Sequence, residues 1–423
     1  MSKTFREWNV EQHWLLPPSV MDFVPADHIA HFVRDTVREQ MDLSEILAPY
    51  EKEERGYPPY NPVMMTALLL YAYCQGVYSS RRIARGCEER MDFMAVTGLN
   101  RPDFRTVSDF RKRHLEALQS LFGQVLTLCQ QAGLVKLGHV SLDGTKVKAN
   151  ASKHKAMSYD RMYQTEKRLK QEVREWFRQA KSADEAEDRL HGATRRGDEM
   201  PGWVADKQQR IIKIREAREA LEAEARAAGK AAVDPTAQRN FTDPESRIMR
   251  KSGKEYVQAY NAQAAVDSTA QVIVAQSLSN NATDVQQLAP TLKQIKRNTG
   301  RQAKEFSADA GYCSEGNLAV LARHHVDCYI ATGRQRHHEA SATGRRRTQG
   351  TRVAAMRTKL ARAGRRSRYR LRKSVVEPVF GQIKHARGFR QFMLRGLEKA
   401  QGEWSLICTV HNLLKLARAT KNQ

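Results

Sequence analysis

The pattern of apolar and polar residues changes once along this chain, near residue 136. Before that point, apolar residues recur at helical spacing, as they do on one side of residues 28–43. Helices are predicted over residues 28–43, 63–74, 81–85 and 106–121, the second opened by Pro62 and the last capped by Ser108. We therefore expect an all-α N-terminal domain over residues 1–135.

After residue 136 the pattern is that of strands. Residues 139–148 alternate, with Val140 and Leu142 on one face and Ser141 and Asp143 on the other. Further strands are predicted over residues 256–267, 271–275, 304–310 and 326–331, and helices over 284–298 and 314–325. This order predicts a mixed α/β sheet with its first three strands antiparallel, as in an RNase H-like core. We expect residues 136–423 to form this catalytic domain.

A long charged stretch interrupts the strand pattern. Residues 161–180 and 206–228 each carry an apolar stripe at helical spacing, and residues 182–201 between them have mixed charge. The pattern predicts a helical hairpin inserted in the catalytic domain, over about residues 155–250.

The composition adds the class of partner. The 423 residues carry a net charge of +24 and 41% hydrophobic residues, so the chain has a core and a strong attraction for polyanions. The six cysteines show no Cys-x-x-Cys spacing, which argues against a zinc knuckle. The longest apolar run, residues 64–74, is too short to span a bilayer. We expect a soluble, cytoplasmic, nucleoid-associated protein with double-stranded DNA as its partner and no membrane contact; a basic enzyme without such a partner is the alternative.

The basic residues concentrate in two places. Residues 345–373 contain no acidic residue and many arginines, which predicts a basic arm over residues 334–373 for a phosphate backbone, with a solvated loop as the alternative. The short N-terminal helices resemble a helix-turn-helix arrangement, or else a dimerisation or packing module. The candidate DNA-contacting residues are Arg111, Lys112, Arg113, Arg345, Arg346, Arg347, Arg365, Arg366, Arg372, Lys373 and Lys384.

Three acidic residues are out of character in this basic chain. Asp143 and Asp309 stand at the ends of apolar strands, and Glu377 lies on a predicted helix with Lys384 on the same face. Carboxylates are the ligands that Mg²⁺ prefers, and two Mg²⁺ ions together activate a nucleophile and stabilise a leaving oxygen in phosphodiester chemistry. We expect Asp143, Asp309 and Glu377 to hold two Mg²⁺ ions, for which Mn²⁺ can substitute, with Lys384 beside them at a phosphate.

Other polar residues have competing interpretations. Ser374 precedes Glu377 by three residues, so Glu377 is alternatively a cap of its own helix, although Pro378 fits that poorly. Asp267 is expected to be a turn residue and Asp284 a charge at a helix N-terminus. His411 is expected to pack in a helix.

Several segments together resemble bacterial insertion-sequence transposases of the DDE type. They are Leu142-Asp143-Gly144-Thr145, Tyr260-Asn261-Ala262-Gln263, Asp309-Ala310-Gly311-Tyr312 and residues 376–384, followed by Arg387-Gly388-Phe389-Arg390. The resemblance implies an RNase H-like fold with Asp143, Asp309 and Glu377 as the metal-binding triad. Many such enzymes carry Tyr-x-x-Arg-x-x-x-Glu-x-x-x-x-x-x-Lys. Glu377 and Lys384 keep the last spacing, whereas Tyr369 and Arg372 each lie one residue upstream of the expected position.

The resemblance implies a transposase that binds terminal inverted repeats, cleaves DNA beside them and transfers the strand to a target. Such a protein acts as a homodimer or larger assembly on DNA, since two ends must be joined. Two alternatives stay open: an RNase H-like nuclease that takes no part in transposition, and a non-catalytic DNA-binding protein derived from a transposase.

Overall fold

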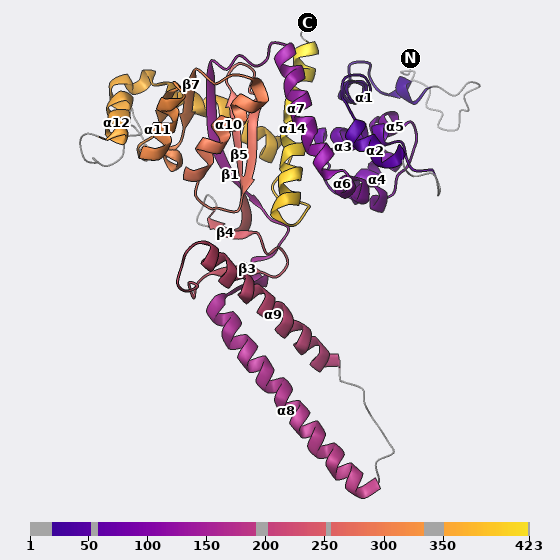
Figure 1. Cartoon of the computed structure of the whole chain (residues 1–423). Helices are drawn as coiled ribbons and strands as arrows, with labels where there is room; N and C mark the ends of the chain where they lie inside the picture. Colours follow the sequence, from indigo (N-terminus) through magenta and orange to yellow (C-terminus); the bar gives the residue numbers. More distant parts are fainter. Residues whose placement is uncertain (1–18, 52–57, 192–201, 251–254, 334–350, 422–423) are drawn as a thin grey trace, which may run out of the picture.

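A mixed β-sheet forms the centre of the molecule (Figure 1). The computed structural model describes residues 19–51, 58–191, 202–250, 255–333 and 351–421. The strands of the sheet are β1 (His139–Lys148), β4 (Arg247–Arg250), β5 (Tyr256–Asp267), β6 (Ile273–Ser279), β7 (Glu305–Ala308) and β8 (Asp327–Ile330). The fold is mixed α/β, and β5 runs antiparallel to both β1 and β6. The predicted fold class is therefore confirmed.

Strand β1 holds the central position in this sheet. It pairs antiparallel with β5 on one side and parallel with β7 on the other, and β8 continues the sheet beyond β7. Strands β4 and β6 pair with successive parts of the long β5. Val140 and Leu142 of β1 are fully buried, as the alternation of the sequence predicts, and Ser141 on the other face is buried as well, so both faces of this part of the strand are covered.

The N-terminal part is helical. Its helices are η1 (Val20–Phe23), α1 (Ile29–Glu39), α2 (Ser44–Glu51), α3 (Pro62–Cys74), α4 (Ser80–Glu89), α5 (Met91–Thr97), α6 (Phe104–Arg113) and α7 (Leu115–Gln131). Asn61 caps α3, whose first residue is Pro62, as the sequence predicts. The single helix predicted over residues 106–121 is wrong. The helix is interrupted at His114, so that α6 and α7 are separate helices. The N-cap of α6 is Asp103, which accepts a hydrogen bond from Thr106 N at 2.7 Å.

Helices α7 and α14 (Leu397–Lys421) lie side by side between the sheet and helices α1–α6 (Figure 1). Trp404, Leu406, Val410 and Leu413 of α14 are fully buried in an apolar core that continues from the sheet into the N-terminal helices. The predicted boundary at residue 135 falls in the loop between α7 and β1. Packing is therefore continuous across that boundary.

Side chains from the helices occupy the free edge of β6. Asn412 Oδ1 accepts from Ile273 N at 2.8 Å, and Asn412 Nδ2 donates to Ile273 O at 2.8 Å, as a neighbouring strand would. Asn298 Nδ2 donates to Val274 O at 3.0 Å, and Leu278 N donates to Gln401 Oε1 at 2.5 Å. An exposed strand edge pairs readily with other chains, so these carboxamides close it.

The predicted helical insertion projects from the body as a hairpin (Figure 1). It consists of β2 (Ala156–Ser158), α8 (Tyr159–His191), α9 (Gly202–Ala227) and β3 (Gln238–Asn240), with η2 (Lys153–Lys155) before it. The hairpin has a small apolar core of its own. Glu166, buried at the base, is paired with Lys170, Arg215 and Arg218, which offsets the cost of its buried charge. Because β4 belongs to the main sheet, the insertion ends before residue 247.

The remaining helices follow β6, β7 and β8 along the chain. They are η3 (Val285–Gln287), α10 (Leu288–Thr299), η4 (Ala310–Tyr312), α11 (Glu315–Arg323), α12 (Arg352–Ala363), η5 (Gly364–Arg366), η6 (Arg368–Leu371), α13 (Arg372–Gly381) and the π-helix η7 (Gln382–Ala386). Within the ranges described above, no helix has the length and apolar character needed to cross a bilayer.

We expect Asn412→Ala to lower the free energy of unfolding by roughly 2–4 kcal/mol, because it leaves a buried N–H and a buried C=O of β6 without partners. Asn298→Ala, at a half-buried site with one such bond, is the control and should lose about 1 kcal/mol. Urea unfolding followed by circular dichroism measures both. Equal losses would contradict the assignment of Asn412 as the substitute for a neighbouring strand.

Candidate active site

Two of the three predicted carboxylates come from neighbouring parallel strands: Asp143 lies within β1, and Asp309 directly follows β7. β1 and β7 are paired up to the residues immediately before Asp143 and Asp309. The N–H of Gly144 donates to Asp143 Oδ1 at 2.9 Å, and the N–H of Gly311 donates to Asp309 Oδ1 at 2.8 Å. The backbone therefore orients one oxygen of each carboxylate.

Glu377 comes from α13, whose buried face packs against β1 and β5. Val376 and Val379 are fully buried, whereas the Glu377 side chain is 43% exposed. The alternative role of Glu377 as a cap is wrong. Helix α13 begins at Arg372, two residues before Ser374, and the Ser374 hydroxyl donates to a backbone carbonyl three residues earlier at 3.0 Å.

Helix α13 is attached to the turn between β5 and β6 at the carbonyl that Pro378 leaves without a helical hydrogen bond. The missing N–H of Pro378 leaves the carbonyl of Ser374 without a helical donor. Gln271 Nε2, from the turn between β5 and β6, donates to that carbonyl at 2.9 Å. Gln271 Oε1 accepts in turn from Gln382 Nε2 at 3.2 Å and from Lys415 Nζ at 2.8 Å. This network sets the position of the helix that carries Glu377.

Arg372 joins Glu377 to Asp143. Its Nη1 lies 2.5 Å from Asp143 Oδ2 and its Nη2 lies 2.8 Å from Glu377 Oε1, while the arginine side chain is only 15% exposed. The centre of its guanidinium lies 5.9 Å from the centre of the Tyr369 ring. Arg372 thus contacts Glu377 although it lies one residue upstream of the position that the transposase motif predicts. We predicted Arg372 as a DNA contact, and it lies instead within the acidic site.

The acidic site is short of positive charge. Burial raises the pKa of Asp143 to about 7; Arg372 opposes this rise, and Asp309 and Glu377 add to it. Burial also raises the pKa of Asp309, again against Arg372, and Asp284 contributes to the rise. A cation among these carboxylates would favour their ionised forms.

The three carboxylates are suitable ligands for a divalent metal ion, but the guanidinium of Arg372 lies between those of Asp143 and Glu377. Asp143, Asp309 and Glu377 supply the carboxylate oxygens that Mg²⁺ prefers. Among the residues that the structure describes, no three His, Cys, Asp or Glu side chains are already gathered as a cation-binding set. An ion shared by Asp143 Oδ2 and Glu377 Oε1 would displace the ion pairs that Arg372 makes with these two atoms.

Lys384 lies against β1 near Asp143. Its ammonium donates to Thr145 Oγ1 at 2.5 Å and to Lys146 O at 2.8 Å, from a one-turn π-helix that follows α13. Side chains two residues apart on a strand share a face, so Thr145 and Asp143 point the same way. The structure thus places Lys384 on the face of the sheet that carries Asp143.

The predicted DNA contacts at the end of α6 divide into two kinds. Arg111 is buried and donates to Tyr73 Oη and Tyr78 O, each at 3.0 Å, so its side chain is part of the core and we withdraw it as a DNA contact. Lys112 and Arg113 are exposed on the same helix.

The predicted basic arm is partly a packed helix. Helix α12 buries Val353, Met356 and Leu360, whose spacing is that of one helix face. Arg366 and Lys373 are exposed beyond it. Arg345, Arg346 and Arg347 lie outside the described residues, as does the side chain of Arg365.

Two predicted structural roles are confirmed and one is incomplete. Asp267 is a turn residue, because its carboxylate accepts from Thr269 N at 2.8 Å and from Leu137 N at 2.7 Å. His411 is buried, with its Nε2 at 2.9 Å from the carbonyl oxygen of Gln271. Asp284 does stand at a helix N-terminus, but its side chain makes no capping hydrogen bond there. It lies instead beside Gly311, close to Asp309.

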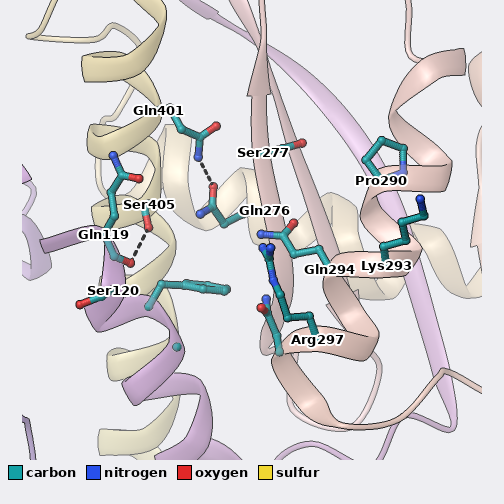
Figure 2. Close-up of a pocket in the computed structure, with 13 residues that line it drawn as sticks. Gln119, Ser120, Gln276, Ser277, Pro290, Lys293, Gln294, Arg297, Gln401 and Ser405 are labelled. Carbon is teal, nitrogen blue, oxygen red and sulfur yellow. Dashed lines mark hydrogen bonds between the residues drawn. The ribbon is translucent and has the colours of Figure 1, made fainter. Parts of the chain in front are cut away.

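A second hollow lies apart from the acidic site. This groove of about 740 Å³ separates α7 and α14 from α10, with β6 as its floor (Figure 2). Gln401 Nε2 donates to Gln276 Oε1 at 2.8 Å across one end of it. The lining contains carboxamides, hydroxyls, Lys293 and Arg297 but no carboxylate, so it offers a divalent metal no anionic ligand.

Comparison with known families agrees with this geometry. Residues 227–413 match the family described as Transposase DDE domain, and residues 18–113 match the family described as Transposase domain (DUF772). No curated protein and no solved structure gives a significant match. The chain belongs to the insertion-sequence transposases of the DDE superfamily. Asp309 and Glu377 fall within the first matched segment, whereas Asp143 lies between the two.

The raised pKa of Asp143 makes stability depend on pH. Because that pKa is about 7 in the folded chain against an ordinary 3.8, the folded chain binds more protons in this interval. Its stability therefore falls as the pH rises through the interval. Asp143→Asn removes this titration. Without metal, we expect the melting temperature of the variant minus that of the wild type to become more positive between about pH 5 and about pH 8.

Calorimetry in a chelating buffer measures this difference, and Glu398→Gln, at an exposed residue, is the control. A difference that stays constant or falls with pH would contradict the placement of Asp143 in a site short of positive charge.

Proposed function

We propose that the chain binds the terminal inverted repeats of its element, cleaves DNA beside them, and transfers the freed strand to a target. Phosphodiester hydrolysis would come first, with water as nucleophile and a 3′-OH as leaving group. That 3′-OH would then attack a target phosphodiester. Two observations support the proposal: Asp143 and Asp309 come from neighbouring parallel strands, and Arg372 forms ion pairs with both Asp143 and Glu377.

Asp143, Asp309 and Glu377 would hold the divalent cations, which we propose to be two Mg²⁺ ions that Mn²⁺ can replace. When bound, the cations activate the attacking oxygen and stabilise the leaving oxygen. The residues of the chain set the geometry. Gly144 and Gly311 orient the two aspartates, and Lys384, on the same face, is placed to steady a phosphate.

DNA binding would use exposed basic residues around the site and on the N-terminal helices. The net charge of +24 provides a strong attraction for a phosphate backbone. The exposed members of the predicted set are Lys112 and Arg113 of α6, Arg366 of η5 and Lys373 of α13. We keep residues 1–135 as the proposed DNA-binding or dimerisation domain, and we propose that the protein acts on DNA in the cytoplasm.

Joining two ends calls for at least two protomers. The hairpin of α8 and α9 extends away from the body and is a candidate for contact with DNA or with a second protomer (Figure 1). Its exposed Tyr163, Phe177 and Ile212 supply apolar surface for such a contact.

The alternative functions keep the same fold. A nuclease outside transposition would cut DNA that lacks the repeats, and a non-catalytic DNA-binding protein would tolerate the loss of the carboxylates. The three acids argue against the second alternative, because carboxylates near DNA repel phosphate unless a cation lies between them.

The test is Mg²⁺-dependent nicking of a duplex that carries the inverted repeats flanking the gene. We expect Asp143→Ala and Glu377→Gln each to reduce the rate on the order of 100-fold or more, since a metal ion supplies several kcal/mol of transition-state stabilisation. Glu398→Gln, which makes the same change at an exposed residue, should retain the wild-type rate.

Two results separate the alternatives. Wild-type nicking in both triad variants would exclude the proposed catalytic residues. Equal cutting of duplexes with and without the repeats, and no joining to a target duplex, would favour the nuclease.

A further inference from the structure

Asp284 is a fourth carboxylate at the edge of the proposed active site. Its Oδ1 accepts from Asn261 Nδ2 at 2.6 Å and from Gln263 Nε2 at 2.8 Å, both on β5. Lys146 Nζ of β1 lies 3.6 Å from the same oxygen. A short loop before α10 is thereby attached to β5 and β1, the strands that flank the site.

The glycines that follow the two aspartates leave room for Asp284. A Cβ on Gly144 would lie 2.8 Å from Asp284 Oδ1 and would overlap the side-chain nitrogen of Gln263. A Cβ on Gly311 would lie 3.3 Å from Asp284 Oδ2 and 3.0 Å from Asp309 Oδ1. Asp284 therefore packs against both glycines, which belong to the backbone segments that contain Asp143 and Asp309.

Two more contacts connect Asp284 with the turn that carries Asp309. The hydroxyl of Tyr312, a buried residue of that turn, donates to Gln263 Oε1, and Gln263 donates in turn to Asp284. Asn317 Nδ2 donates to Val285 O at 2.7 Å and to Tyr312 O at 2.8 Å. Asn317 thus links Val285, the residue after Asp284, to the turn that carries Asp309.

We propose that Asp284 is a positioning residue of this active site, which holds the turn carrying Asp309 in register with Asp143 through Gln263 and the two glycines. The inference rests on the proposed function, because it assigns Asp284 to the cation site of Asp143 and Asp309. It also gives a role to Asn261 and Gln263, which belong to a segment of the transposase resemblance but do not touch the three acids in the contacts above.

The experiment compares Asp284→Ala with Asp284→Asn in the full-length chain. Both carboxamides donate to the same oxygen of Asp284, and asparagine keeps an oxygen there while alanine does not. The first readout is Mn²⁺ affinity without DNA, from the free-Mn²⁺ signal in electron paramagnetic resonance. The second is the nicking rate. Asp109→Ala, at an exposed residue of α6, is the matched control, and circular dichroism checks folding.

We expect Asp284→Ala to weaken Mn²⁺ binding on the order of tenfold or more, the usual effect of removing a residue that orients metal ligands. Asp284→Asn should stay within a few-fold of the wild type. Gly144→Ala, whose added Cβ would displace the same network, should weaken Mn²⁺ binding as well, and its effect should be smaller in the Asp284→Ala background.

Wild-type affinity in a folded Asp284→Ala chain would overturn the proposal. So would an Asp284→Asn chain as weak as Asp284→Ala, because the negative charge itself would then be required, as in a direct metal ligand. If the wild type binds Mn²⁺ but does not nick the repeat duplex, the proposed function fails, while the affinities still decide the role of Asp284.

Discussion

The structure depends on how three negatively charged carboxylates are held near one another on one sheet. Asp143 lies within β1, Asp309 follows the adjacent parallel strand β7, and Glu377 approaches from a helix, so the charges of Asp309 and Glu377 both act on the buried Asp143. Such an arrangement is unfavourable without a cation. Arg372 supplies one through its ion pairs with Asp143 and Glu377. One arginine therefore offsets part of the negative charge at this site, and a divalent ion bound to the same carboxylate oxygens would displace it.

Helices and side-chain hydrogen bonds brace the sheet that carries these carboxylates. Helix α14, from the end of the chain, packs on α7 and lets Asn412 pair with the edge of β6, so the sheet is braced on the side that faces the N-terminal helices. Gln271 ties α13 to the turn between β5 and β6. The helical hairpin has its own core and buried ion pairs, so it extends from the body with little demand on the catalytic sheet.

Local patterns in the sequence predicted much of this, and the failures share a cause. Strand β1 has its predicted bounds because alternation is a local property, and α3 starts at Pro62 for the same reason. The helix over residues 106–121 was broken at His114, whose ring bonds to Tyr50, more than sixty residues away. Arg111 and Asp284 were misjudged likewise, since their partners come from distant segments. In α12 the spacing of Val353, Met356 and Leu360 was a helical signal that the density of arginines concealed.

The most direct test of this account is a crystal structure of the chain with Mn²⁺, in which anomalous scattering locates the ions. We expect Mn²⁺ bound by oxygens of Asp143, Asp309 and Glu377, with the guanidinium of Arg372 withdrawn from between Asp143 and Glu377. Mn²⁺ bound elsewhere, or an Arg372 that still bridges the two carboxylates in the presence of the bound ion, would contradict it.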